Sequence, residues 1–344
     1  MKFSIVTPSF NQLDWLRLCV ASVRDQVLPE AGRAGLEDGR QKIEDDKSEI
    51  LPPISHLPSP VSSTLCVEHI IQDAGTPGIE EFTREVGADF YRDGVLVFGS
   101  TEDGRWQMGD EPSTRRYRIT VYSESDAGMY DAVNKGFRRA EGDIYAYLNC
   151  DEQYLPDTLA EIDSQFSASH QTEVFFCDAI VVDAQGGYLC DRRVMVPTRL
   201  HTLVSGNLSI FTSSTFSRAG VFTERGIYFN GSFRNSGDAE WALRLVAARV
   251  SMQAIRLRAA AFTDTGDNLN MQPSGLLEKA QLRATAPVWA KVCKPLIVAF
   301  YRLRRFLAGI YNLTSHSYEI HTLESPRACV RFDVPKPSFI WPGR

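Results

Sequence analysis

Residues 142–152, Gly-Asp-Ile-Tyr-Ala-Tyr-Leu-Asn-Cys-Asp-Glu, decide how this chain folds. The part from 143 to 148 is apolar after Asp143 and predicts a buried strand. Polar residues follow it at once, with Asn149, Asp151 and Glu152 within four positions. In open α/β sheets the ligand binds beyond the carboxyl ends of the strands. The quoted stretch therefore predicts one strand and one side of a binding site.

Similar strands and helices alternate on both sides of this stretch. Strands are expected over residues 2–7, 66–72, 118–123 and 173–182, and helices over 13–26, 130–140 and 156–166. Pro8 lacks a backbone donor and is expected to end the first strand. Strands that alternate with helices at this spacing favour an α/β fold with a mostly parallel sheet and helices on both faces.

Composition excludes several classes of protein. The 344 residues are 43% hydrophobic and 23% charged, which is typical of a globular chain with one large or two modest cores. The net charge of −6 and the scattered bases argue against nucleic-acid binding. The seven cysteines form no CxxC pair, so neither a disulfide framework nor a structural zinc site is indicated. No apolar stretch approaches a membrane span, and a cytoplasmic location is expected.

Two stretches interrupt the regular pattern. Residues 30–49 contain seven acids and four bases, and four prolines follow by residue 60. Such a segment buries too little to order itself, so a mobile, dispensable insertion is expected over about 28–64. A second irregular insertion is expected over about 87–116, which is rich in Gly, Asp and Arg. The predicted domains are 1–260, and a C-terminal helical extension over 261–344.

Carboxylates gather where the predicted strands end. Acidic residues occur within 72–75, 123–126 and 149–152, three segments that a parallel sheet brings together. Neighbouring carboxylates repel one another unless a cation lies between them. Hard oxygen ligands with no His/Cys cluster nearby favour Mg²⁺ or Mn²⁺ over Zn²⁺. The alternative is that these residues are ordinary loop residues and helix caps.

Four motifs in this order resemble the family 2 inverting glycosyltransferases, which have the GT-A fold. They are Ser-Ile-Val-Thr-Pro-Ser-Phe-Asn-Gln (4–12), Glu-His-Ile-Ile-Gln-Asp (68–73), Ser-Glu-Ser-Asp-Ala-Gly-Met-Tyr-Asp-Ala-Val-Asn-Lys-Gly-Phe (123–137) and the stretch quoted above. The resemblance spans roughly residues 2–250. It implies sugar transfer with inversion from a nucleotide-diphosphate sugar, UDP-sugars being favoured, in cell-surface glycan or polysaccharide biosynthesis.

The resemblance also assigns the donor site. By it, Thr7, Pro8 and Phe10 line the nucleotide base, and Asp73 accepts a hydrogen bond from a base N–H. Residues 149–151 stand where the family has its DxD motif. Asp151 is then the ligand of Mn²⁺ or Mg²⁺, and Asn149 faces the ribose without contributing a charge. Four further residues are expected to shape the donor-sugar pocket: Asp126, Asp131, Asn134 and Lys135. Lys135 is equally compatible with a solvated helix face.

A later block, Gly-Asp-Ala-Glu-Trp-Ala-Leu-Arg-Leu (237–245), looks like the acceptor-side motif of that family. Inverting transfer requires a base that removes a proton from the acceptor hydroxyl. Asp238 is the first candidate and Glu240 the second. The competing role for Asp238 is a helix cap, because Ser236 and Gly237 precede it and an apolar helical pattern follows.

Residues 287–311 predict an amphipathic helix whose apolar positions recur at spacings of three and four. Its bases fall mainly on the other side, and Pro295 is expected to kink or restart it. The pattern fits peripheral membrane contact, and equally a helix packed on the domain or a dimer contact. The acceptor, a glycan or a lipid-linked molecule, stays open. Alternatives for the whole chain are a non-catalytic nucleotide- or glycan-binding relative and a sugar nucleotidyltransferase.

Overall fold

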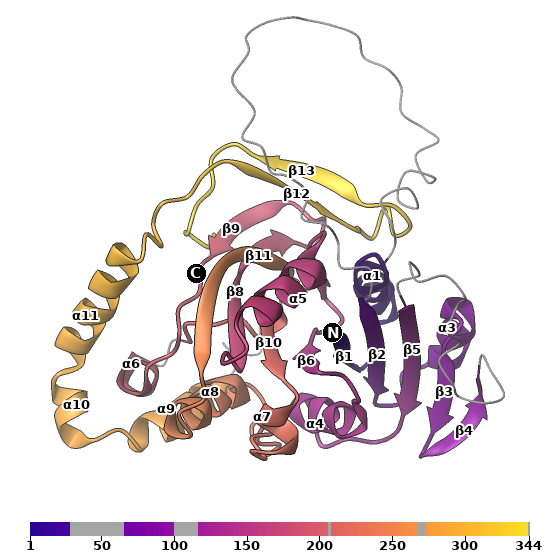
Figure 1. Cartoon of the computed structure of the whole chain (residues 1–344), viewed down its shortest axis with the longest axis horizontal. Coiled ribbons are helices and arrows are strands. Elements are labelled where there is room, and N and C mark those ends of the chain that lie inside the picture. The colour runs from indigo at the N-terminus through magenta and orange to yellow at the C-terminus, as the bar shows by residue number, and fades with distance from the viewer. Residues whose placement is uncertain (28–64, 100–115, 206–207, 267–272, 343–344) are drawn as a thin grey trace, which may run out of the picture.

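The computed structural model describes residues 1–27, 65–99, 116–205, 208–266 and 273–342 (Figure 1). One mixed sheet forms the centre of the molecule. Its strand order is β4 (Val95–Phe98), β3 (Asp89–Arg92), β5 (Arg116–Ser123), β2 (Cys66–Asp73), β1 (Lys2–Ser9), β6 (Ile144–Tyr147), β10 (Thr215–Arg218), β8 (Val174–Asp183), β11 (Met252–Asp264) and β7 (Glu152–Tyr154), and β9 (Tyr188–Arg192) pairs with β8.

The sheet is mostly parallel, as the sequence predicts. Strands β3, β5, β2, β1 and β6 are parallel neighbours, and β8 and β11 run in the same direction beyond β10. The opposite direction is taken by β4, β7, β9 and β10. Since the parallel strands share one direction, their carboxyl ends lie at one edge of the sheet, where the site is expected.

Helices cover both faces of the sheet. On one face, α1 (Leu13–Arg24) and α5 (Thr158–Ala168) pack against Phe3 and Ile5 of β1, and α3 (Ile79–Val86) joins α1 near β5. On the other face, α4 (Met129–Arg139), α7 (Gly220–Thr223) and α8 (Gly237–Ala247) belong to one hydrophobic cluster with Val6. This alternation along β1 follows from the two-residue period of a strand.

The first strand runs past Pro8, which corrects the predicted end at Thr7. The backbone oxygen of Val6 accepts a hydrogen bond from Leu148 N, so the polar groups of residue 6, and by alternation of residue 8, face β6. Because β6 ends at Tyr147, the donor that Pro8 lacks is not needed there. The strand therefore carries Pro8 and Ser9 to the edge of the site.

The expected irregular insertion at 87–116 is wrong for its first part. Residues 89–92 and 95–98 form the edge hairpin β3–β4 of the main sheet. Phe90 is fully buried, and Asp89 pairs with Arg118 of β5 at 3.0 Å. Strands of four residues are too short to produce a readable period, which explains the error. The remaining part, 100–115, and the expected insertion at 28–64 lie outside the described residues.

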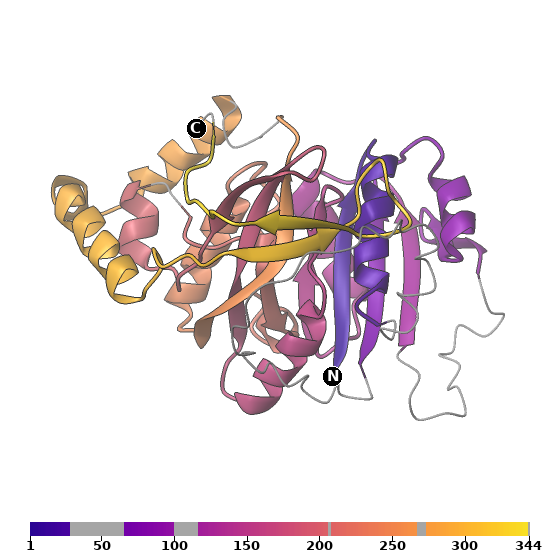
Figure 2. The same cartoon turned by 90° about the horizontal axis from the view of Figure 1, so that it is seen from above.

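The C-terminal part contains three helices and a hairpin. Helices α9 (Pro273–Ala284), α10 (Val288–Val292) and α11 (Lys294–Leu307) lie at the end of the molecule opposite β3–β4 (Figures 1 and 2). Pro295 occupies the first turn of α11, so the predicted restart of the helix is confirmed. The hairpin β12 (His316–Ile320) and β13 (Val330–Val334), which the sequence analysis did not predict, packs on β8 and β11 through Tyr318 and Ile320.

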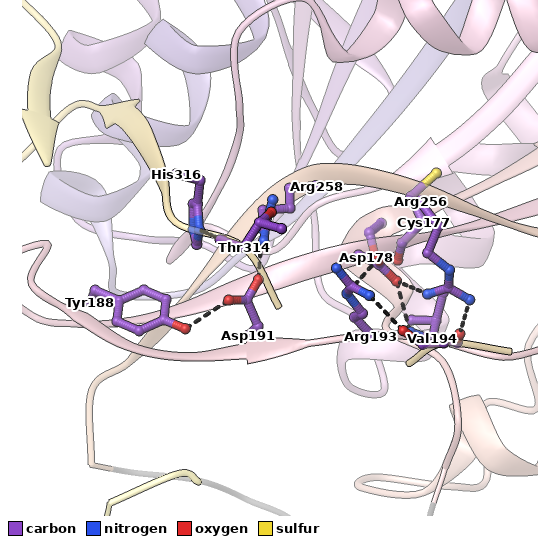
Figure 3. A network of polar contacts seen from close by, with 12 residues as sticks. Cys177, Asp178, Tyr188, Asp191, Arg193, Val194, Arg256, Arg258, Thr314 and His316 are labelled. Atoms are coloured by element: carbon purple, nitrogen blue, oxygen red, sulfur yellow. Dashed lines mark hydrogen bonds and ion pairs between the residues drawn. The ribbon is translucent and has the colours of Figure 1, made fainter. Parts of the chain in front are cut away.

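Two ion-pair groups link β8, β9 and β11 of the sheet beside the C-terminal part. Figure 3 shows Asp191 of β9 between Arg258, at 2.6 Å, and the hydroxyl of Tyr188, at 2.7 Å. Asp178 of β8 lies near Arg256, at 2.7 Å, and Arg193, at 3.8 Å (Figure 3). Arg193 also donates to the backbone oxygen of Gly309 just after α11. This last contact links the end of α11 to the sheet.

Candidate active site

A large cavity opens at the carboxyl ends of β1 and β6. Its volume is about 1660 Å³, and its lining includes Pro8 and Phe10 after β1, Asn149 and Asp151 after β6, and Asp238 of α8. Ordinary ligand pockets enclose about 300–1,000 Å³. This cavity is therefore large enough for two substrates at once.

Two carboxyl groups lie side by side on its wall. Asp151 is half-buried in the turn after β6, and Glu152 is buried at the start of β7 with Oε2 accepting from Asn149 N at 2.8 Å. Burial raises the pKa of Asp151, and burial together with the charge of Asp151 raises the pKa of Glu152. A cation in the cavity would relieve both effects. A divalent metal ion in the cavity would fit this pair of carboxyl groups, and Asp151 is the one that would contact it.

Asp238 faces the cavity from the first turn of α8. Its Oδ1 accepts a hydrogen bond from Ala239 N at 2.8 Å, and its backbone N donates to the hydroxyl of the buried Tyr130 at 3.1 Å. The N-cap residue of α8 is Ser236, so Asp238 lies inside the helix and is not its N-cap. Burial raises the pKa of Asp238 to about 6. A carboxylate with such a pKa can accept a proton near neutral pH.

The structure brings together half of the residues predicted from the sequence. The cavity lining includes Pro8, Phe10, Asp126, Asn149, Asp151 and Asp238, and does not include Thr7, Asp73, Asp131, Asn134, Lys135 and Glu240. The residues of the second group make hydrogen bonds to other parts of the protein and do not border the cavity.

Thr7 and Asp73, which are predicted to contact the nucleotide base, belong to this second group. The hydroxyl of the fully buried Thr7 is 2.8 Å from Nε2 of His69, whose pKa burial lowers to about 3. Oδ2 of Asp73 accepts from the backbone N of Gly75 and Thr76, at 2.8 and 2.9 Å. Its Oδ1 is buried without a hydrogen-bond partner among the described residues. Buried polar atoms in proteins are nearly always hydrogen-bonded, so this oxygen is an exception.

Three residues of α4 hold the loop and the segment that border the cavity. Asp131 accepts from Ala127 N at 3.0 Å, and Lys135 donates to the backbone oxygen of Ser125 at 2.6 Å. Asn134 makes two hydrogen bonds to the backbone of Phe229, at 2.7 and 2.9 Å. These contacts fix the loop 123–128 that carries Asp126 to the cavity.

Glu240 is engaged on the outer side of α8. Its two carboxylate oxygens accept from Nε and Nη2 of Arg244, at 2.8 and 2.9 Å. Arg244 also donates to the backbone oxygen of Tyr228. A carboxylate held in this way is a poorer candidate for the base than Asp238, which lines the cavity.

The opposite wall of the cavity is basic, and sequence reasoning missed it. Its positively charged residues are Arg192, Arg234, Lys279, Lys294, Arg302 and Arg305. They come from four parts of the chain: β9, α9, α11 and the short segment that precedes α8. No short motif therefore contains them. The bases of α11 were noticed as one side of an amphipathic helix, but their position at the cavity depends on tertiary packing.

Gly128 lies where the loop 123–128 meets Arg234 of the basic wall. Its φ of +118° lies in a region that L side chains rarely adopt. A Cβ at this position would also collide with the guanidinium of Arg234. The Asp-Ala-Gly sequence at 126–128 therefore allows the acidic loop and the basic wall to approach closely.

Two comparisons with known protein sequences match a segment of this chain. The family model for glycosyl transferase family 2 matches residues 94–216, a segment that contains Asp126, Asn149 and Asp151. The O-antigen biosynthesis protein RfbC of Myxococcus xanthus is 28% identical over 120 residues, which are 34% of this chain and 9% of that protein. The chain thus matches only a small part of this relative's length. Both matches are similarities of a segment of this chain.

Solved structures support the fold. Residues 1–349 of S. aureus TarS in complex with UDP-GlcNAc are 13% identical, with a TM-score of 0.51 over 89% of this chain and 73% of that one. The same protein in complex with UDP is 14% identical with a TM-score of 0.49, over 89% and 72%. The first likeness confirms the expected α/β architecture of the GT-A type. Of the helices in the described part of the chain, none is both long and apolar enough to span a bilayer.

Proposed function

We propose that the chain transfers a sugar, with inversion, from a nucleotide-diphosphate sugar to an acceptor hydroxyl in the biosynthesis of a cell-surface polysaccharide. The observation that carries the proposal is the placement of Asp151 and Asp238 on one cavity, with the first after β6 and the second in the first turn of α8. The cavity volume of about 1660 Å³ accommodates a donor and an acceptor together.

The donor is proposed to bind on the side of β1 and β6. Phe10, which is exposed in the cavity, supplies an apolar surface for the nucleotide base, and the unpaired Oδ1 of Asp73 lies behind it. We favour a UDP-sugar, because a protein of the same fold has been solved with UDP and with UDP-GlcNAc. Asn149 can accept from or donate to a ribose hydroxyl without adding charge.

Asp151 is proposed to hold Mn²⁺ or Mg²⁺. The raised pKa values of Asp151 and Glu152 support this proposal, because burial disfavours their charged forms and a bound cation would favour them. A bound divalent ion supplies charge neutralisation for the diphosphate. Glu152 accepts from Asn149 N and so holds the turn that presents Asp151.

Asp238 is proposed to accept the proton of the acceptor hydroxyl. The hydrogen bond from Ala239 N orients its carboxylate, and the N-terminal position in α8 places it close to the positive end of that helix. Burial raises its pKa to about 6, so it is ionised at neutral pH and still basic enough to take a proton. Glu240 is the second candidate and is engaged by Arg244.

The outer face of α10 and α11 is proposed to contact an anionic membrane surface from the cytoplasmic side. Leu296, Phe300, Leu303 and Leu307 are between 50 and 75% exposed, so the stripe predicted from the sequence is uncovered over α11, although Ile310 at its end is buried. Residues 279–318 contain seven bases and no acid, in a chain of net charge −6. Apolar side chains flanked by bases suit an interface with anionic headgroups, and favour a lipid-linked acceptor.

The proposal is tested by donor turnover. UDP-sugars, GDP-sugars and dTDP-sugars are offered to the full chain with Mn²⁺, with Mg²⁺ and with a chelator, and release of nucleoside diphosphate is measured. We expect metal-dependent release from one nucleotide class. Binding without any release would support the non-catalytic relative instead, and pyrophosphate release from a nucleoside triphosphate and a sugar phosphate would support a nucleotidyltransferase.

A further inference from the structure

Three potential metal ligands meet on the side of the molecule where α1 ends. Asp25 follows α1, His321 follows β12, and Cys329 precedes β13. Each residue offers one ligand atom, and the three atoms lie within 4.8 Å of one another. Nε2 of His321 is 2.9 Å from Oδ2 of Asp25 and 3.5 Å from Sγ of Cys329. None of the three lines the sugar-transfer cavity.

The fold brings these residues together from distant parts of the chain. Ile320 and Val330 are paired across the hairpin, so His321 and Cys329 face each other at the start of its loop. The loop end of the hairpin lies beside α1, which supplies Asp25 (Figure 1). The backbone N and O of His321 are bonded to the side chain of Gln153, at 2.9 and 2.8 Å. The position of His321 is therefore fixed by β7 and not by the ligand atoms alone.

The geometry does not match a Cys-His-Asp nucleophile. In such a relay the thiol and the carboxylate bond to different nitrogens of the imidazole. Here both contact Nε2, which can donate only one proton or accept only one. Three ligand atoms as close to one another as these are instead typical of a metal site.

We propose that Asp25, His321 and Cys329 bind one Zn²⁺ ion that ties the C-terminal hairpin to α1. Zinc is bound in proteins by thiolate, imidazole and carboxylate, with bonds of about 2.0–2.3 Å. Such bonds require ligand atoms roughly 3–4 Å apart, and the three atoms here are already close to that spacing. The soft thiolate distinguishes this site from the oxygen site at Asp151, which suits Mn²⁺ or Mg²⁺. A fourth position is left for water.

The site adds stability and not catalysis. It joins residue 25 to residues 321 and 329, and so closes a loop that includes nearly the whole chain. Through Gln153 the hairpin contacts β7, which also carries Glu152. The exposed Cys329 and the absence of a CxxC pair explain why the sequence pattern did not indicate zinc.

The test uses the full-length protein stripped with a chelator and titrated with Co²⁺ and Zn²⁺. We expect one Co²⁺ per chain with a thiolate-to-cobalt charge-transfer band, displacement of that band by Zn²⁺, and a rise in Tm that grows with Zn²⁺ concentration. Cys329→Ser should lose the band and weaken Zn²⁺ binding by about 10²-fold or more. Cys66→Ser, a partly exposed cysteine of β2, is the matched control and should keep both.

His321→Gln should behave like Cys329→Ser, and the Tm of both variants without metal shows whether they fold. Because Cys329 is exposed, its variant is expected to match the wild type in that measurement. A wild-type protein without the charge-transfer band, or equal Zn²⁺ affinity in Cys329→Ser and Cys66→Ser, would overturn the proposal. Either result leaves the sugar transfer untouched, since that is measured by nucleotide release with Mn²⁺.

Discussion

The two walls of the cavity are built in different ways. The donor wall comes from short segments at the carboxyl ends of β1 and β6 and from the loop 123–128, and it is acidic. The opposite wall comes from β9, α9, α11 and the segment just before α8, and its charged residues are mainly basic. A parallel sheet brings strand ends together by itself, whereas the second wall requires the C-terminal part to pack across the sheet. The first can therefore be found in motifs and the second cannot.

The largest effect is expected on the donor wall. Asp151→Asn should abolish transfer and metal-dependent nucleotide binding, because a neutral amide cannot stabilise a divalent cation at the diphosphate. Asp131→Asn is the matched control, since Asp131 is also an acid of the predicted donor site but lies outside the cavity lining. It should keep its bond from Ala127 and most of the activity. Nucleotide binding is measured by calorimetry with and without Mn²⁺.

If both variants bind nucleotide as the wild type does, the metal site must be placed elsewhere. If Asp131→Asn is as inactive as Asp151→Asn while its Tm is unchanged, the donor sugar reaches further toward α4 than the cavity lining shows. Either outcome would contradict the assignment of Asp151 to the donor site and of Asp131 to a position outside it.

The next effect is expected where the two walls face each other, at Asp238. Asp238→Asn should lower kcat by about 10² or more and leave donor binding unchanged, as for a lost general base. The asparagine oxygen can still accept from Ala239 N, so α8 should stay intact. In the wild type, kcat/KM should fall as pH drops through about 6, because the protonated carboxyl cannot take the acceptor proton.

Glu240→Gln is the control for this prediction. Because Glu240 is paired with Arg244, its replacement should cost a little stability and keep the pH profile. Near-wild-type turnover of Asp238→Asn, together with loss of activity in Glu240→Gln, would assign the base to Glu240.

The sequence was informative where chemistry and local structure coincide. The strand at 143–148 and the polar Asn149, Asp151 and Glu152 after it could be predicted because one short segment contains both. The edge strands β3 and β4 could not, since four residues give no period. Arg234, Arg302 and Arg305 could not be placed at the cavity, because their position follows from how α8 and α11 pack.

A smaller effect is expected at Gly128, where the walls come into contact. Gly128→Ala should lower the free energy of unfolding by about 1–3 kcal/mol, because its backbone lies in a region that only glycine adopts readily. It should also lower kcat/KM, since the new Cβ displaces Arg234 from the cavity wall. Chemical denaturation and steady-state kinetics measure the two effects.

Gly226→Ala separates strain from displacement. Gly226 also has a positive φ, +66°, but a Cβ there would meet nothing within 4 Å. This variant should lose stability and keep kcat/KM. Equal kinetics for the two variants would show that the position of Arg234 does not matter for transfer.

The smallest effect on turnover is expected at the outer surface behind the basic wall. Replacing Leu296, Phe300 and Leu303 of α11 together by serine should weaken binding to anionic vesicles by at least about tenfold, since each large apolar side chain contributes on the order of 1 kcal/mol or more when buried. Turnover with a soluble acceptor should not change, because these side chains point away from the cavity lining. Co-sedimentation with vesicles measures the binding.

The matched control for this surface lies at the other end of the molecule. Val95, Leu96 and Val97 of β4 are also about half-exposed or more, but they lie opposite α11 (Figure 1). Serine at these three positions should leave vesicle binding unchanged. High salt should weaken the binding of the wild type, because Arg283, Lys291 and Arg304 lie outside the cavity lining and residues 279–318 contain no acid. Equal pelleting of all three proteins would exclude the α11 surface as the membrane contact, and with it the argument for a lipid-linked acceptor.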